Sequence, residues 1–202
     1  MKRFLFTIFL FILLISTPVQ AGRRINNHDK NATKKLVTRY MEAVKRYDAR
    51  TYLGCYQSKK YRKRVLYWVS KEMVKYLKLT KKDYFSYTIS EIKLKSRKGT
   101  AYVTVSYYDA FSDLHDAWKE YFYEHLFDDD YSFDTDFFCR YYLRHEYEFR
   151  ENREYEIKTE KVKIPLIYRK GRWMIEKQNR AMDYMEDGGL NHWYRTVMHE
   201  FP

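Results

Sequence analysis

The spacing of apolar residues changes once along the chain, and this change determines which fold classes are possible. From residue 36 to residue 77 apolar side chains recur every three or four positions, as on one face of a helix. From Tyr87 onward they recur every second position, as on one face of a strand. Helices followed by hairpins of strands predict an α+β domain with N-terminal helices packed on a curved antiparallel sheet.

Three helices are expected before the sheet. The first is capped by Asn31 or Thr33 and runs to about Tyr47, and a shorter one follows the cap Asp48 and ends near Gly54. The third covers about residues 60–77. Residues 22–30 are polar and are expected to be a flexible N-terminus.

Two hairpins are expected to form the sheet. Residues 87–94 alternate with a phase shift that indicates a β-bulge, residues 96–99 turn the chain, and residues 101–108 alternate cleanly. Residues 162–168 and 173–175 form the second hairpin around Lys170 and Gly171. Pro165 within that hairpin predicts an edge position or a bulge, because proline donates no hydrogen bond to a sheet.

Helical periodicity returns between the hairpins and at the C-terminus. Residues 114–126 and 137–142 predict a helical insert of about residues 110–154. Residues 190–201, which follow Gly188 and Gly189, predict an amphipathic C-terminal helix. Residues 31–202 are therefore expected to form a single domain that includes the insert.

The first 21 residues have the three zones of a secretory signal peptide. Lys2 and Arg3 precede an apolar run of eleven residues, 5–15, and small residues follow Pro18 up to Ala21. The alternative is an uncleaved anchor, but a bilayer-spanning helix needs about 20 apolar residues. We expect cleavage after Ala21, a secreted or periplasmic protein, and no transmembrane segment in the mature chain.

Charge is divided along the sequence. Residues 22–108 carry a net charge of +17, and residues 109–136 carry −9. A basic run starts at Lys59, and an anionic surface could bind its candidate residues, Lys59, Lys60, Arg62, Lys63, Arg64, Lys71 and Lys75. The alternative is that these basic residues form the solvent-exposed face of an ordinary amphipathic helix. Export argues against nucleic acid as a partner.

Two cysteines remain in the mature chain, Cys55 and Cys139. An even number in an oxidising compartment is compatible with one disulfide between them. Two buried free thiols are the alternative, because unpaired cysteine behaves as a small apolar residue.

Motifs for nucleophilic catalysis, phosphate binding and metal binding are missing from the sequence. His115 and His125 are ten residues apart, which places them on different faces of a helix, and the acidic residues 128–136 lack the glycine turn of a calcium loop. No metal and no cofactor are predicted.

The order of elements resembles the nuclear transport factor 2-like superfamily, a cone-shaped, cystatin-like α+β fold. The resemblance depends on residues 36–52, on residues 101–105 and on residues 168–175, "YRKGRWMI". It implies a pocket between a long helix and a curved sheet. Enzymes of this fold use Asp, His and Tyr beside the sheet, and the nearest residues here are Tyr107, Tyr108, Asp109 and His115. None of these matches a family catalytic motif by spacing.

Three functions are compatible with the sequence. The leading expectation is an exported, non-catalytic module that binds a small apolar ligand or a protein partner. The alternative is a small lyase or isomerase with an acid–base site in the cone pocket. The second alternative is an envelope-associated protein that binds anionic surfaces through its basic helix.

Overall fold

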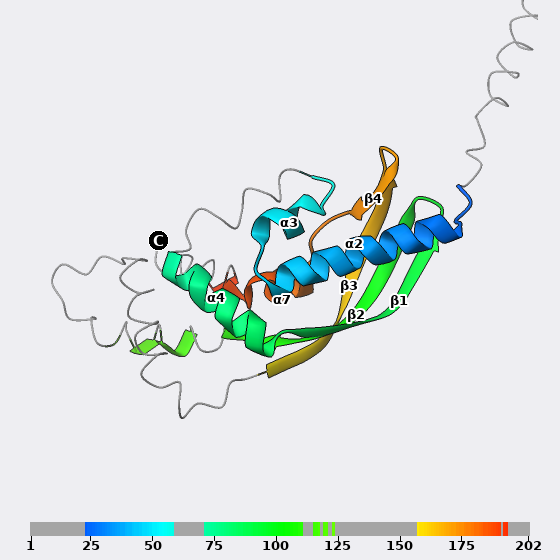
Figure 1. Cartoon of the computed structure of the whole chain (residues 1–202). Coiled ribbons are helices and arrows are strands. Elements are labelled where there is room, and N and C mark those ends of the chain that lie inside the picture. Colours follow the sequence, from blue (N-terminus) through cyan, green and yellow to red (C-terminus); the bar gives the residue numbers. More distant parts are fainter. Residues whose placement is uncertain are drawn as a thin grey trace, which may run out of the picture.

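A computed structural model describes residues 23–58, 71–110, 115–117, 119–120, 123, 157–190 and 192–193 (Figure 1). The described part has the α+β architecture expected from the sequence, with a four-stranded antiparallel sheet. Its helices are α2 (Asn27–Lys45), α3 (Ala49–Gly54), α4 (Lys71–Tyr84) and α7 (Arg180–Asp187). Its strands are β1 (Ser86–Lys95), β2 (Lys98–Tyr108), β3 (Ile157–Arg169) and β4 (Arg172–Ile175).

Helix α2 begins earlier than its sequence predicted. Asn26, rather than Asn31 or Thr33, is the N-cap, and its side chain accepts a hydrogen bond from the Asp29 backbone N–H at 2.9 Å. The Asp29 carboxylate accepts from the Asn26 backbone N–H in return, which completes a capping box. The first turn of α2 therefore lies within the segment 22–30 that was expected to be flexible. Asp48 caps α3 as predicted.

The sheet has the strand order β1-β2-β3-β4, with all neighbours antiparallel. The predicted bulge is present in β1, where the register shifts between Ile89 and Glu91. The first turn is shorter than expected, because Lys98 and Gly99 already belong to β2. The second turn is confirmed at Lys170 and Gly171.

Pro165, for which the sequence predicts an edge position or a bulge, lies on the inner strand β3 just outside the part that pairs with β4. Strand β4 pairs with Leu166–Arg169 of β3, so among the described strands the earlier part of β3 pairs with β2 alone. The Pro165 carbonyl accepts a hydrogen bond from the Glu176 backbone N–H at 2.9 Å. The N–H and C=O of one strand residue point to the same side. The N–H that Pro165 lacks would therefore point away from β2, and the β2–β3 ladder loses no hydrogen bond.

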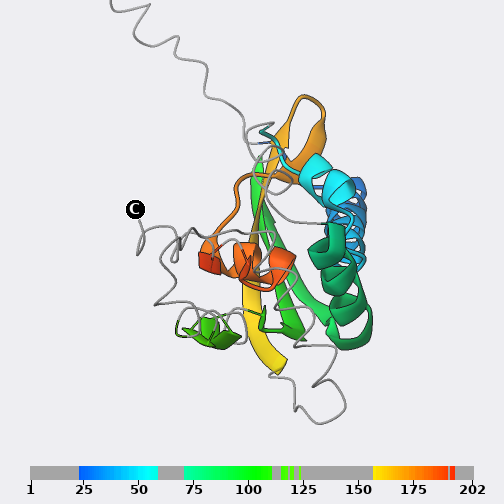
Figure 2. The same ribbon diagram turned by 90° about the vertical axis from the view of Figure 1, so that its left-hand side faces the viewer.

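The core lies on one face of the sheet. Figure 2 shows α2, α3 and α4 together on one side of the strands. Alternate residues of β2 and β3 point toward them, and β2 is completely buried at Ala101, Val103 and Val105. Tyr40, Met41 and Val44 of α2 pack against this face. Period-two strands and a period-3.6 helix thus bury their apolar sides against each other.

Helix α7 follows β4 and closes the core beside the C-terminal end of α2 (Figure 1). Asn179 caps its N-terminus, and Met182 and Met185 are fully buried. Gly188 ends it in the left-handed conformation, with φ at 70°. A Cβ there would approach the Ala110 Cβ to 3.3 Å, so glycine suits both the backbone angle and the packing. The sequence pattern did not predict a helix over these residues.

Most of the predicted insert, the basic run 59–70 and the end of the predicted C-terminal helix lie outside the described residues. Leu190 and Trp193, the first apolar positions of that helix, are helical and buried. In the part of the chain that the structure describes, no helix has the length and apolar character needed to cross a membrane.

Candidate ligand-binding site

A cleft of about 240 Å³ opens where the first turn of α2 meets the β3–β4 hairpin. Its wall contains cationic side chains, aromatic rings and one carboxylate. The lining residues are Arg23, His28, Asp29, Ala32, Tyr168, Gly171, Arg172 and Trp173.

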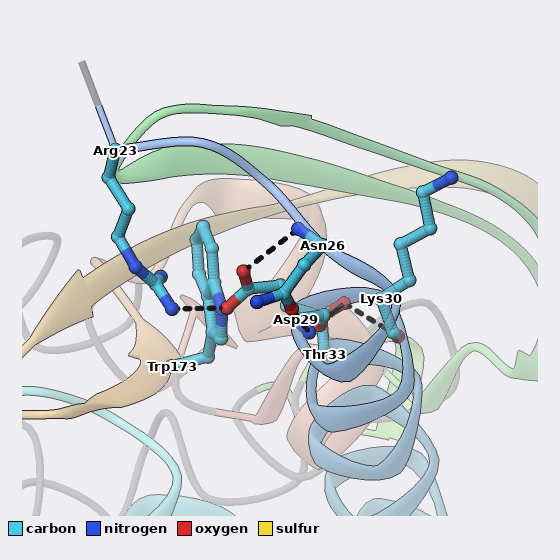
Figure 3. Close-up of polar contacts among 6 residues, drawn as sticks. All are labelled: Arg23, Asn26, Asp29, Lys30, Thr33 and Trp173. Carbon is cyan, nitrogen blue, oxygen red and sulfur yellow. Dashed lines mark hydrogen bonds and ion pairs between the residues drawn. The ribbon is translucent and has the colours of Figure 1, made fainter.

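Asp29 is the structural centre of the cleft (Figure 3). Its side chain is 1% exposed and accepts three hydrogen bonds, from the Trp173 Nε1 at 2.9 Å, the Arg23 Nη2 at 2.5 Å and the Asn26 backbone N–H at 3.2 Å. The bond from Trp173, assisted by those from Asn26 and Arg23, lowers the pKa of Asp29 although burial opposes this. Asp29 is therefore an ionised anchor with its oxygens already in use.

Arg23 connects this anchor to the aromatic wall. Its guanidinium carbon lies 3.4 Å from the centroid of the Tyr168 ring, which is the geometry of a stacked cation–π contact. The Nη2 atom donates to Asp29. The other terminal nitrogen, Nη1, is buried and has no hydrogen-bond partner within the described residues. A buried donor of a charged group costs free energy when it has no hydrogen-bond partner. A ligand acceptor that bonded to Nη1 would therefore bind favourably.

The hairpin turn places the two aromatic rings. Lys170 and Gly171 have φ angles of 52° and 78°, which is the type I′ pattern that matches the twist of two-residue hairpins. Tyr168 and Trp173 are directly paired across this turn, and their ring centroids are 5.5 Å apart. Trp173 is buried, whereas Tyr168 and Arg172 remain accessible beside the cleft.

A second polar cluster lies inside the core. Glu186 of α7 is 1% exposed, and its Oε1 accepts short hydrogen bonds from the Tyr40 and Tyr56 hydroxyls. Its Oε2 accepts from the Gln178 Nε2 at 2.6 Å. Burial raises the pKa of Glu186 to about 7, although the two tyrosine hydrogen bonds act in the opposite direction.

Lys81 of α4 is a buried cation close to this cluster. Its Nζ donates to the Met185 carbonyl at 2.7 Å, and burial lowers the pKa of Lys81 to about 8. Both oxygens of Glu186 are occupied by protein donors. The cluster is therefore suited to joining α7 to α2 and to the segment after α3, and it presents no carboxylate oxygen to a substrate.

The four catalytic candidates from the sequence do not converge on one open site. Tyr107 is buried, and its hydroxyl donates to Glu160 at 2.7 Å. Tyr108 is the next residue of β2, so its side chain points to the opposite face of the sheet. Asp109 forms an ion pair with Lys158 at 3.9 Å and is 8% exposed. His115 is half-buried.

The other predicted site residues have mixed outcomes. Cys55 is a buried free thiol whose Sγ donates to the Thr51 carbonyl at 3.5 Å, so the structure contains no bridge from Cys55 to Cys139. Cys139 lies outside the described residues, as do five of the anion-surface candidates, Lys59, Lys60, Arg62, Lys63 and Arg64. Lys75 is exposed on α4. In the described ranges, no three His, Cys, Asp or Glu residues come together as a metal site.

Neither the Asp29 cluster nor the Glu186 cluster was predicted from the sequence, although signals for parts of them were present. Asn26 followed three residues later by Asp29 resembles a capping box, and Asn179 with Gly188 frames a short helix. The pairing of Asp29 with Trp173, 144 residues away, has no local signal.

Comparison with protein-family models, with curated proteins and with solved structures finds no match to this chain. A functional assignment therefore depends on the chain's own residues.

Proposed function

We propose that this chain is an exported, non-catalytic binding module, and that its ligand is a small molecule with a planar apolar part and an anionic group. The main observation in support of the proposal is the hydrogen bonding of the Arg23 guanidinium in the cleft. Its guanidinium is held by Asp29 and Tyr168, while its buried Nη1 has no partner among the described residues. This is a fixed donor with unused capacity beside an accessible aromatic ring.

The charges and shape of the cleft favour the same class of ligand. Asp29 already accepts hydrogen bonds from three donors. The charge of a ligand that fits the cleft is therefore determined by Arg172 and by the unused donor of Arg23, which favour an anion. Guanidinium groups bind carboxylates and phosphates with directed hydrogen bonds. A volume of about 240 Å³ is below the ~300–1,000 Å³ of drug-sized sites, so the ligand is small, such as one ring with a carboxylate.

A cone-like fold is part of this proposal. The long helix α2 packed on an antiparallel sheet supports the resemblance to the nuclear transport factor 2-like superfamily. We infer that residues 110–154 form the helical insert and that residues 190–201 form the C-terminal helix. Export is inferred from the apolar leader and the small residues before Gly22.

Calorimetric titration of the chain starting at Gly22 tests the binding proposal. Benzoate and phenyl phosphate serve as anionic planar probes, and benzyl alcohol is the neutral analogue. We expect the anionic probes alone to bind, and Arg172→Gln to weaken them roughly 10–100-fold. Arg169→Gln is the matched control, because Arg169 is exposed on the same hairpin and does not line the cleft. Equal binding of benzyl alcohol, or equal losses in both variants, would contradict the proposal.

A further inference from the structure

The face of the sheet opposite the helices is rich in lysine. Residues of β1, β2 and β3 that alternate with the core positions point to this outer face. Five exposed lysines belong to it, and we name them the lysine face: Lys93, Lys95, Lys98, Lys161 and Lys163. Figure 2 shows α2, α3 and α4 on the other side of the strands.

Few acidic groups offset these charges. Glu91 belongs to the same face and pairs with Lys93 at 3.2 Å, and Glu176 pairs with Lys98 at 3.8 Å. Lys95, Lys161 and Lys163 have no ion pair within the described residues. Lys95 is directly opposite Lys98 across the β1–β2 pair, and like charges in that position destabilise a sheet. The folded state gains nothing from this arrangement.

The outward residues between the lysines on β1 and β2 are mostly polar. Thr88, Thr100, Thr104 and Ser106 occupy the outward positions of β1 and β2, and Tyr102 lies beneath Lys93 with 5.4 Å between its ring centroid and Nζ. On β3, Pro165 and Ile167 are partly buried and Ile157 is exposed on the same face, so an apolar protein partner would find only a few apolar side chains beside the lysines. A second copy of the chain placed face to face would bring two cationic surfaces together, which costs free energy.

The lysines extend in two dimensions. They occupy three adjacent strands, which are about 4.8 Å apart, and successive outward positions along each strand are roughly 7 Å apart. A single polyanion strand would engage one row of such an array. A layer of lipid headgroups presents negative charge in two dimensions and can meet all the rows together. From this match we propose that the lysine face binds the surface of an anionic lipid membrane.

This surface differs from the basic helix that the sequence suggested and from the cleft at Asp29. Binding would be electrostatic, because the lysine side chains reach the headgroups while the sheet stays outside the hydrocarbon region. A lysine near an anionic membrane strengthens binding roughly fivefold, and the attraction decays within a Debye length. The proposal therefore predicts strong salt dependence and no requirement for the cleft ligand.

Vesicle co-sedimentation tests the proposal with the chain from Gly22, so that the apolar leader does not itself bind lipid. We expect binding to mixed phosphatidylglycerol–phosphatidylcholine vesicles and none to pure phosphatidylcholine. Lys95→Gln, Lys161→Gln and Lys163→Gln together should weaken binding about 100-fold. The control replaces Lys30, Lys34 and Lys35, which are exposed on α2, with the same loss of charge. Its effect should stay below about threefold, because α2 lies farther from the membrane than a Debye length.

Several results would overturn the proposal. One is equal binding to neutral and anionic vesicles, and another is equal loss of binding in the two triple variants. Binding of heparin through the lysine face without binding to vesicles would identify a soluble polyanion as the partner instead. A dimer of the unmodified chain that the lysine-face substitutions dissociate would identify the face as a self-interface. Circular dichroism of both variants shows whether each is folded, and a folded lysine-face variant that binds normally also contradicts the proposal.

Discussion

The indole Nε1 of Trp173 donates a hydrogen bond to the Asp29 Oδ1 across 2.9 Å, and this bond joins the last strand of the sheet to the first turn of α2. The two residues are 144 positions apart in the sequence. Both residues also line the cleft. The same bond therefore contributes to the fold and to the geometry of the candidate site.

Replacement of Trp173 by Phe tests the contribution of this bond. The ring stays apolar, but Asp29 loses one of its three donors while it remains buried. A hydrogen bond to a charged group contributes about 2 kcal/mol, so we expect a loss of that size in the free energy of unfolding, measured in urea. Tyr168→Phe is the control, because the ring that stacks on Arg23 remains. Equal losses in the two variants would show that the indole N–H has no special role.

Two tyrosines of the core offer a matched comparison. Tyr40 and Tyr52 are both fully buried, but the Tyr40 hydroxyl donates to Glu186, whereas the Tyr52 hydroxyl has no hydrogen-bond partner in the described part of the chain. Tyr40→Phe should lower the free energy of unfolding by about 2 kcal/mol, and Tyr52→Phe should change it by less than about 0.5 kcal/mol or raise it. The reverse order in urea denaturation would contradict the hydrogen bonding described here.

Glu186 should make stability depend on pH. Its pKa of about 7 in the folded protein lies above the ordinary value of 4.5, so the folded state holds a proton that the unfolded state loses between these pH values. Stability contributed by the protonated form is present below pH 4.5 and is lost as pH rises through 7. The loss is on the order of 3 kcal/mol, since one pKa unit corresponds to about 1.4 kcal/mol. Lys81, with its pKa lowered to about 8, changes stability only at higher pH and in the opposite direction.

Urea unfolding of Glu186→Gln between pH 5 and pH 7.5 measures this effect, and we expect the variant to show a flatter dependence than the unmodified chain. Glu91→Gln is the control, because the Glu91 side chain is exposed on the outer face of the sheet. A Glu186→Gln profile parallel to that of the unmodified chain would show that this carboxyl does not titrate in the range.

The Cys55 thiol should be unreactive in the folded protein. It is 4% exposed, and burial raises its pKa to about 11, so the reactive thiolate is scarce at neutral pH. In a Cys139→Ser background we expect slow reaction with an aromatic disulfide reagent under native conditions and rapid reaction in denaturant. A mass for the unmodified chain that is two protons lighter, with no titratable thiol in denaturant, would instead establish a disulfide.

Gly99 should not tolerate a side chain, because a Cβ atom would clash with neighbouring atoms. A Cβ at this position would lie 2.5 Å from the Leu94 Cδ2 and 2.8 Å from the Lys93 carbonyl oxygen. Gly99→Ala should therefore cost about 2 kcal/mol in thermal or urea unfolding. Gly54→Ala is the matched control: nothing lies within 4 Å of its Cβ position, and alanine favours the helix by up to about 1 kcal/mol. Equal effects at the two positions would contradict the packing at Gly99.

Local patterns predicted what depends on local geometry. The period of two located the strands and the bulge in β1, because alternation reflects which face of the sheet is buried. The Lys170-Gly171 turn and the Asp48 cap were predicted for similar reasons, since both depend on neighbouring residues. The start of α2 was predicted at least five residues too late, because the residues before Asn31 look polar in the sequence. The contact with the distant Trp173, together with the nearby Arg23, keeps that turn in place.

The sequence by itself determined the class of fold, the N-terminal position of the first helices, the order of the strands, and the surplus of positive charge. Only the tertiary structure decided where the charged groups act. It buried Glu186 beneath two tyrosines, paired Asp29 with Trp173, and brought Lys95, Lys161 and Lys163 to one face of the sheet. The physical reason is that periodicity reports which side of an element is apolar. The partner of a buried charge is set by contacts between distant segments, which no local pattern encodes.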